Sequence, residues 1–369
     1  MGKNKKPARK KPQGKKTEHV INSASTDTGY FSCALLNALA VNFNGRIDTG
    51  EKRVRSCCEP VEDVPAVGFG ETGKETIESF IQLRNNVISE SALPASGRTF
   101  SNGCVKCANY QQKNWQNDNL IHYVNLSMYP APCQCRCIYC GVYKNDGEKF
   151  SNPVVRNSYE KMFGAIEYAQ KSGLITPDAT WQVSSGEITI HPYKDRIFSI
   201  VKNQTAVFYT NCFKYDEQIG ENLSANSRSA INLSIDSGTP NTWRKIKGFD
   251  NFDEVTDNLV KYYKSSARAG QITLKYIVLP DINDNYEDFA SVIEIMKTLK
   301  VKHLTLARDG RTKYSETPED SEKLAGAAGY LLAMLHTNQL TYDMFTFSPI
   351  EREKALLFAK KLVSTGEVQ

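Results

Sequence analysis

No run of about 18 apolar residues occurs in the sequence, so no segment is long and apolar enough to cross a membrane as a helix. The first residues are basic, yet no apolar stretch follows them, which argues against a secretory signal peptide. Residues 1–16 contain eight lysines and arginines but no acidic residue. Because the whole chain has a net charge of +5, the remainder is slightly acidic. From these absences we expect a cytoplasmic protein without a transmembrane segment.

Residues 1–28 have the composition of a basic tail and a polar linker. They hold too few apolar residues to build a core, so we expect them to be disordered. A basic tail can bind nucleic acid, an anionic lipid surface or an acidic partner. A tail that only keeps the protein soluble is the simpler interpretation, and we favour it over nucleic-acid binding.

Cysteine, in contrast, is abundant, with ten residues in a chain of 369. In a reducing compartment, thiols at such a density more often bind metals than form disulfides. The cysteines also fall into groups, which supports metal binding. They are Cys33, Cys57, Cys58, Cys104 and Cys107 in the first third, Cys133, Cys135, Cys137 and Cys140 close together, and Cys212 alone.

Residues 119–369 alternate short apolar runs, typical of strands, with helical patterns. The expected strands cover residues 121–126, 180–183, 206–210, 230–235, 272–279 and 303–306. The expected helices cover residues 158–172, 215–224, 251–269, 286–299, 318–335 and 351–363. This alternation predicts an α/β fold with a parallel sheet covered on both faces. Periodicity alone leaves two arrangements open, an open doubly wound sheet and a partial barrel.

The strongest chemical signal follows the first of these strands, where Cys133, Cys137 and Cys140 have the spacing CxxxCxxC. Three thiolates on a short loop can hold three irons of a 4Fe–4S cluster, which leaves the fourth iron open to a small molecule. A zinc knuckle and a ferredoxin-like electron carrier are the alternatives. Zinc sites prefer paired CxxC hooks, and a carrier needs a fourth cysteine nearby. Cys135 is close enough, but its two-residue spacing from both neighbours is awkward.

This motif, with Tyr139 just before its last cysteine, resembles the radical S-adenosylmethionine (radical SAM) superfamily. The resemblance implies a partial (β/α)6 TIM-like barrel, which decides between the two sheet arrangements. It also implies a 4Fe–4S cluster and S-adenosyl-L-methionine as cofactors, with an external electron donor such as flavodoxin or ferredoxin. In that family the cofactor binds the open iron, one electron cleaves it, and the resulting 5′-deoxyadenosyl radical takes a hydrogen atom from the substrate.

Further segments at the expected strand ends agree with this family. The pair Gly186-Glu187 resembles its Gly-Glu motif, which binds the amino group of the cofactor. The segment Ser234-x-Asp236 resembles one near the ribose and carboxylate of the cofactor. Cys212 replaces a glycine that relatives often carry, and we expect it to be structural. The resemblance implies the following cofactor-binding residues, with no catalytic residue assigned: Tyr139, Ser185, Gly186, Glu187, Thr210, Asn211, Ser234 and Asp236.

Several charged side chains leave two interpretations open. Lys275 points into the barrel toward the substrate, or it extends along the rim. Arg244 pairs with the cofactor carboxylate, or it lies exposed on a helix. His303 and Arg308 are equally open between a functional and a structural role. Asp281 stands in a turn where relatives usually have glycine, so the turn matches only loosely.

The cysteines of residues 29–118 suggest a second site. Cys104 and Cys107 form a CxxC pair, which with two distant cysteines can close a four-thiolate site. Together with a helix expected near residues 75–89, the pattern resembles the SPASM or twitch auxiliary-cluster domain, although that domain follows the barrel in its families. The favoured ligands are Cys33, one of Cys57 or Cys58, Cys104 and Cys107. By resemblance we expect a second 4Fe–4S cluster in preference to zinc, with unligated thiols as the remaining alternative.

The resemblance predicts three segments: a disordered tail and linker (1–28), an auxiliary-cluster domain (29–118), and the partial barrel with a C-terminal helix (119–369). It predicts an enzyme that abstracts a hydrogen atom to oxidise, epimerise or cross-link an unreactive C–H position in a peptide or sugar-type substrate. Two other classes remain. One is an RNA- or nucleotide-modifying radical SAM enzyme that uses the basic tail. The other is a non-catalytic iron–sulfur or zinc protein.

Overall fold

The computed structural model describes residues 30–46, 54–57, 64–105, 107, 109–115, 118–140, 149–184, 186–310 and 317–367. The predicted tail and linker, Cys58 and Ser185 lie outside these residues. Ten strands form one sheet in the order β12-β11-β10-β9-β8-β7-β6-β2-β3-β4. Their bounds are β2 (Val41–Arg46), β3 (Val54–Arg55), β4 (Ala66–Val67), β6 (Ile121–Tyr129), β7 (Ile175–Val183), β8 (Thr205–Tyr209), β9 (Ala230–Ser234), β10 (Ile272–Val278), β11 (His303–Arg308) and β12 (Thr341–Phe345). A separate antiparallel pair joins β1 (Tyr30–Ser32) to β5 (Gln111–Lys113).

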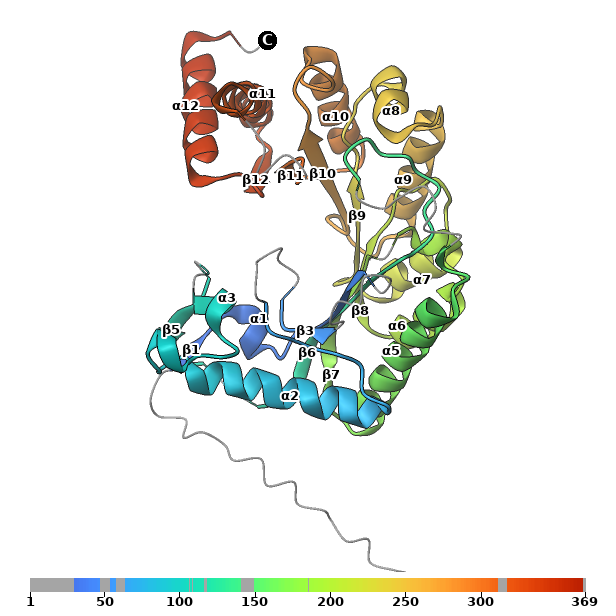
Figure 1. Cartoon of the computed structure of the whole chain (residues 1–369). Coiled ribbons are helices and arrows are strands. Elements are labelled where there is room, and N and C mark those ends of the chain that lie inside the picture. The colour runs from blue at the N-terminus through green and yellow to red at the C-terminus, as the bar shows by residue number, and fades with distance from the viewer. Residues whose placement is uncertain are drawn as a thin grey trace, which may run out of the picture.

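From β6 to β12 the strands follow one another around the sheet in chain order, and each pairs in parallel with the next. A doubly wound sheet reverses its strand order at a switch point, whereas a (β/α) barrel does not. Helices α5, α6, α7 and α9 lie along one side of the curved sheet (Figure 1). The described chain is therefore an α/β fold with a mostly parallel sheet, wound as a barrel is and open between β4 and β12.

Most connections between the strands are helices. They are α1 (Ala34–Asn37), α2 (Gly73–Glu90), α3 (Asn102–Val105), α5 (Pro153–Lys171), α6 (Lys194–Val201), α7 (Glu217–Ala225), α8 (Pro240–Lys247), α9 (Phe252–Ser265), α10 (Tyr286–Thr298), α11 (Pro318–Thr337) and α12 (Pro349–Thr365), with short 3-10 turns η2 (Ala95–Gly97) and η3 (Ile188–Ile190). Capping boxes begin α2, α11 and α12, at Thr72, Thr317 and Ser348. Each box satisfies backbone N–H groups that would otherwise lack a partner in the first helical turn. None of the helices in the described segments is long and apolar enough to span a bilayer.

The sheet has more parallel strands than the six expected. β12 was not expected because its sequence, Thr-Tyr-Asp-Met-Phe, mixes polar and apolar residues, unlike the apolar runs of buried strands. β2 lies in the region assigned to a separate N-terminal domain, yet it pairs in parallel with β6. β3 and β4 then extend the same sheet in antiparallel pairing. Strands β2, β3 and β4 therefore continue the main sheet, which crosses the boundary expected at residue 118.

The core lies between the sheet and its helices, with Trp181, Trp243 and Tyr276 among the largest fully buried side chains. Helix α2 packs against α5 at a close approach of their backbones. A Cβ atom on Gly73 would lie 2.1 Å from the carbonyl oxygen of Gly164, so only glycine fits there. This contact attaches the N-terminal helix to the outside of the barrel.

Candidate active site and second cysteine site

The predicted cofactor-binding residues described here lie on the loop after β6 or at the carboxyl ends of β7, β8 and β9. The carboxyl ends of parallel strands meet at one edge of a sheet, which is where α/β barrels place their sites. The cysteine loop, residues 130–140, crosses this edge directly after β6. The fold therefore brings to one place the segments that the sequence marked separately.

Gly186 allows the end of β7 to approach the cysteine loop closely. Its φ is +56°, and a Cβ atom there would lie 2.3 Å from the carbonyl oxygen of Pro132. The next residue, Glu187, donates its backbone N–H to that same oxygen at 2.8 Å. A side chain at position 186 would collide with this carbonyl oxygen and break the contact, so only glycine fits there.

Glu187 is buried, and its carboxylate joins the ends of β7 and β8. Oε1 accepts hydrogen bonds from Thr189 N (3.0 Å), Thr189 Oγ1 (2.8 Å) and Thr210 Oγ1 (2.9 Å). Oε2 accepts one from Asn211 N at 2.7 Å. Burial raises the pKa of this carboxyl group, and the hydrogen bonds oppose that effect. Glu187 is thus a positioning residue for Asn211, and its contact with a cofactor ammonium group remains a prediction.

Asn211 reaches from β8 to the cysteine loop. Its Nδ2 lies 3.3 Å from Cys135 Sγ and 3.9 Å from Cys133 Sγ. Its Oδ1 accepts a hydrogen bond from Gln134 Nε2 at 3.3 Å. The structure therefore gives Asn211 a direct role at the cysteines.

The sulfur atoms of the loop interact with one another. The thiol of Cys135 hydrogen-bonds to Cys133 and Cys137, which lowers the pKa of Cys133 and brings that of Cys137 to about 6. The same bonds raise the pKa of Cys135. Cys140 is partly buried, and its backbone N–H donates to the carbonyl of Cys137 at 3.1 Å. Four cysteines on one loop, two of them with a lowered pKa, suit the donor set of an iron–sulfur cluster.

Tyr139, Asp236 and Lys247 form a network beneath the loop. Asp236 is fully buried, and its Oδ2 accepts hydrogen bonds from Tyr139 OH and Lys247 Nζ, both at 2.5 Å. Its Oδ1 accepts one from Ile277 N at 2.7 Å. Asp236 has no exposed surface and joins Tyr139 to Lys247, and its contact with the ribose of the cofactor remains a prediction. Lys247 Nζ also donates to the carbonyl of Ser234, whose side chain is partly buried at the end of β9.

The C-terminal end of α8 holds the cysteine loop through its backbone as well. Arg136 N donates to Lys247 O, and Ile138 N donates to Ile246 O, both at 3.0 Å. The helix ends at Gly248, which takes a φ of +80°. The sequence did not single out Lys247, because its place among Arg244, Lys245 and Lys247 looks like an ordinary basic helix face. The buried pair is formed only when this helix docks on the loop.

Lys247→Met should destabilise the protein, because Asp236 would keep a buried charge without its partner. Breaking a buried ion pair from one side costs about 3–5 kcal/mol. Urea unfolding followed by fluorescence would measure the loss. Lys245→Met, an exposed position on the same helix, is the matched control and should unfold like the wild type. Equal stability of Lys247→Met and the wild type would show that the network does not hold the loop.

A second group of four cysteines lines a cavity of about 30 Å³ in the N-terminal region. Cys33 precedes α1, Cys57 follows β3, and Cys104 and Cys107 belong to α3 and the turn after it. Burial, reinforced by the neighbouring cysteines, raises the pKa of Cys104 to about 12. Four thiols from separate segments line one space, and four thiolates are the donor set of an iron–sulfur cluster. In the described part of the chain, no three histidine, cysteine or acidic side chains are arranged to hold a single metal ion.

Hydrogen bonds from Arg84 hold the segment that follows Cys33 in place. This side chain of α2 is buried and donates to the carbonyls of Leu36 and Asn37 and to Asn119 Oδ1. Of the two alternatives at positions 57 and 58, Cys57 lines the cavity, whereas Cys58 is outside the described residues.

The residues left open by the sequence take the following places. Lys275 is partly buried, and burial lowers the pKa of its ammonium group while the charges of Asp236 and Cys140 oppose this. Arg244 is exposed and pairs with Asp250 at 3.4 Å, and Arg308 forms a buried pair with Glu351 at 2.7 Å.

The remaining sequence expectations concern Cys212, His303 and Asp281. Cys212 is fully buried in the core with a φ of +56°, the backbone conformation that its glycine counterpart would favour. His303 is exposed and hydrogen-bonded to Thr341 Oγ1. Asp281 has a φ of +65°, so it also adopts the conformation expected of glycine.

Residues 132–294 match the family model described as "Radical SAM superfamily". No curated protein sequence matches the chain. Among solved structures, Streptococcus suis SuiB matches at 12% identity over 74% of this chain and 55% of SuiB, with a TM-score of 0.45. SuiB bound to precursor peptide SuiA matches at 13% identity over 65% and 58%, with a TM-score of 0.45. A radical SAM methyltransferase from Sphaerobacter thermophilus matches at 11% identity over 50% and 55%, with a TM-score of 0.35. The chain thus spans little more than half the length of these proteins.

Proposed function

Residues 132–294 are a domain of the radical SAM superfamily, and on that premise we propose that the protein cleaves S-adenosylmethionine reductively and removes a hydrogen atom from an unreactive C–H bond. The observation that carries the proposal is the CxxxCxxC loop, which lies inside the matched domain at the carboxyl edge of the sheet. Cys133, Cys137 and Cys140 would hold a 4Fe–4S cluster. When bound, this cluster supplies the electron that cleaves the cofactor, after an external donor has reduced it.

The other residues of this edge would bind and orient the cofactor. Asn211 donates toward the loop sulfurs, and Glu187 holds Asn211 in place through its backbone N–H. Ser234, partly buried at the end of β9, offers a hydroxyl group to the cofactor. Lys247 and Asp236 hold Tyr139, and with it the cysteine loop, in position through hydrogen bonds to the Tyr139 hydroxyl group.

We assign the second cysteine site to an auxiliary 4Fe–4S cluster held by Cys33, Cys57, Cys104 and Cys107. The convergence of these four thiols on one cavity supports the assignment. Such a cluster would take an electron from the substrate after hydrogen abstraction, or bind the substrate. Oxidation, epimerisation or cross-linking of a peptide or sugar-type substrate would each follow from the same first step.

Anaerobic protein with reconstituted clusters, reduced with dithionite, should convert S-adenosylmethionine into equal amounts of 5′-deoxyadenosine and methionine. Liquid chromatography with mass spectrometry measures both products, and omission of the reductant is the control. Slow cleavage without substrate is sufficient to support the proposal. Protein that contains zinc in place of iron and forms no 5′-deoxyadenosine would instead be the non-catalytic alternative.

A further inference from the structure

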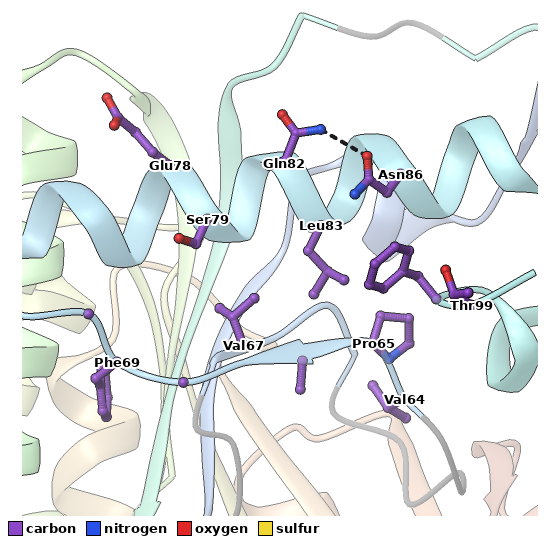
Figure 2. Close-up of a pocket in the computed structure, with 14 residues that line it drawn as sticks. Val64, Pro65, Val67, Phe69, Glu78, Ser79, Gln82, Leu83, Asn86 and Thr99 are labelled. Atoms are coloured by element: carbon purple, nitrogen blue, oxygen red, sulfur yellow. Dashed lines mark hydrogen bonds between the residues drawn. The ribbon is translucent and has the colours of Figure 1, made fainter.

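A groove of about 930 Å³ lies between the edge of the sheet and helix α2. One wall is the segment 64–70, which includes β4, and the other is formed by α2 between Glu78 and Asn86. Figure 2 shows the segment and the helix running side by side, with Val67 and Leu83 pointing toward one another. The volume lies in the upper part of the range of ligand-binding pockets, about 300–1,000 Å³.

The backbone of β4 has hydrogen-bonding groups at the free edge of the sheet, beside this groove. Among the described strands, β4 is the last of the sheet and pairs only with β3, with Ala66 opposite Arg55. The adjacent residue Pro65 uses its carbonyl to accept from Ser56 N at 3.2 Å, so it faces β3. In an antiparallel ladder the orientation alternates from residue to residue. The N–H and C=O of Ala66 therefore point away from β3, as do those of Gly68.

The dimensions of the groove suit an extended chain. Residues 64–70 span about 20 Å if extended, and residues 78–86 span about 12 Å of helix. A ligand that fits this shape is elongated and about four to six residues long if it is a peptide. A compact ligand would leave part of segment 64–70 uncovered, including backbone groups of Ala66 or Gly68 that point away from β3.

We propose that this groove binds an extended peptide segment of another molecule, which pairs with β4 as an additional strand of the sheet. Strand addition satisfies the outward N–H and C=O groups, and alternate side chains of the peptide then face α2. These side chains would contact two apolar residues, Val67 and Leu83. They would also contact three polar residues of α2, which are Ser79, Gln82 and Asn86. The inference concerns binding alone and holds whether or not the proposed radical chemistry is correct.

The groove also adjoins the second cysteine site, since Val64 lines both the groove and the four-cysteine cavity. Arg55, the partner of Ala66, precedes Cys57 by two residues in the chain. A peptide paired with β4 would therefore pass close to the cysteine cavity.

The test uses full-length protein panned against a display library of random dodecapeptides. The most enriched peptide is then synthesised, and its affinity is measured by fluorescence anisotropy with each backbone nitrogen methylated in turn. We expect binding to weaken tenfold or more at every second position of the paired segment. Methylation removes the N–H groups that face β4, whereas the intervening ones point away from it. The absence of an enriched peptide, or losses without this period of two, would overturn the proposal.

Two variants on α2 assign the bound peptide to the groove. Ser79→Arg places a long side chain in the groove and should weaken binding at least tenfold. Ser89→Arg, the same change at an exposed position of α2 outside the groove, should bind as the wild type does. If Ser79→Arg fails to fold, Gln82→Arg on the same wall replaces it. Unchanged binding by the folded groove variant would overturn the assignment. Binding that appears only after deletion of residues 1–28 would assign the groove to the chain's own tail.

Discussion

Replacing Cys137 with alanine should abolish the formation of 5′-deoxyadenosine and remove about four irons per chain. The CxxxCxxC motif supplies three thiolates to a four-iron cluster, so losing one leaves two and should release the cluster. The hydrogen bond from Cys135 and the charge of Lys247 both lower the pKa of Cys137, which favours its metal-binding form. Iron analysis and detection of 5′-deoxyadenosine by mass spectrometry would measure the two losses separately.

Cys135→Ala is the matched control on the same loop and should keep both the iron and the cleavage. This control is a stringent one, because Cys135 contacts Asn211 and interacts with both Cys133 and Cys137, so its removal changes the surroundings of two proposed ligands and of their neighbour. We expect its role to be supportive, with a smaller effect than that of Cys137. If Cys135→Ala loses the cluster while Cys133→Ala keeps it, the three ligands are chosen wrongly and the proposed function weakens.

The parallel strands between residues 121 and 308 could be predicted because each is a short apolar run and most are followed by a helical pattern. Strand β12 could not, since its mixture of polar and apolar residues resembles a loop with scattered apolar residues. Helix α6 was missed because it has only eight residues, too few to show a clear period, and α8, equally short, was anticipated only as a helix that could carry Arg244. The place of β2 beside β6 depends on a pairing between distant segments, which local patterns do not reveal.

At the candidate active site, the strand-end positions of Gly186, Glu187 and Asn211 followed from the motifs. The partners of these residues did not follow. The buried network of Lys247 with Asp236 joins two residues that the sequence presents as a basic helix and a ribose-binding turn. Its formation depends on the docking of α8 against the cysteine loop, which is a tertiary contact. The groove beside β4 was equally unpredictable, since it forms where α2 folds back along a strand of two residues.

At the second cysteine site, Cys104→Ala should lower the iron content from about eight to about four per chain while S-adenosylmethionine cleavage continues. The four cysteines line a cavity of their own, built from α1, β3 and α3, so losing its cluster leaves the CxxxCxxC loop intact. Cys212→Ala is the matched control, because this buried cysteine belongs to the core and should leave all eight irons in place. If wild-type protein already holds only about four irons together with zinc, the N-terminal cysteines form a zinc site and the assignment of an auxiliary cluster is wrong.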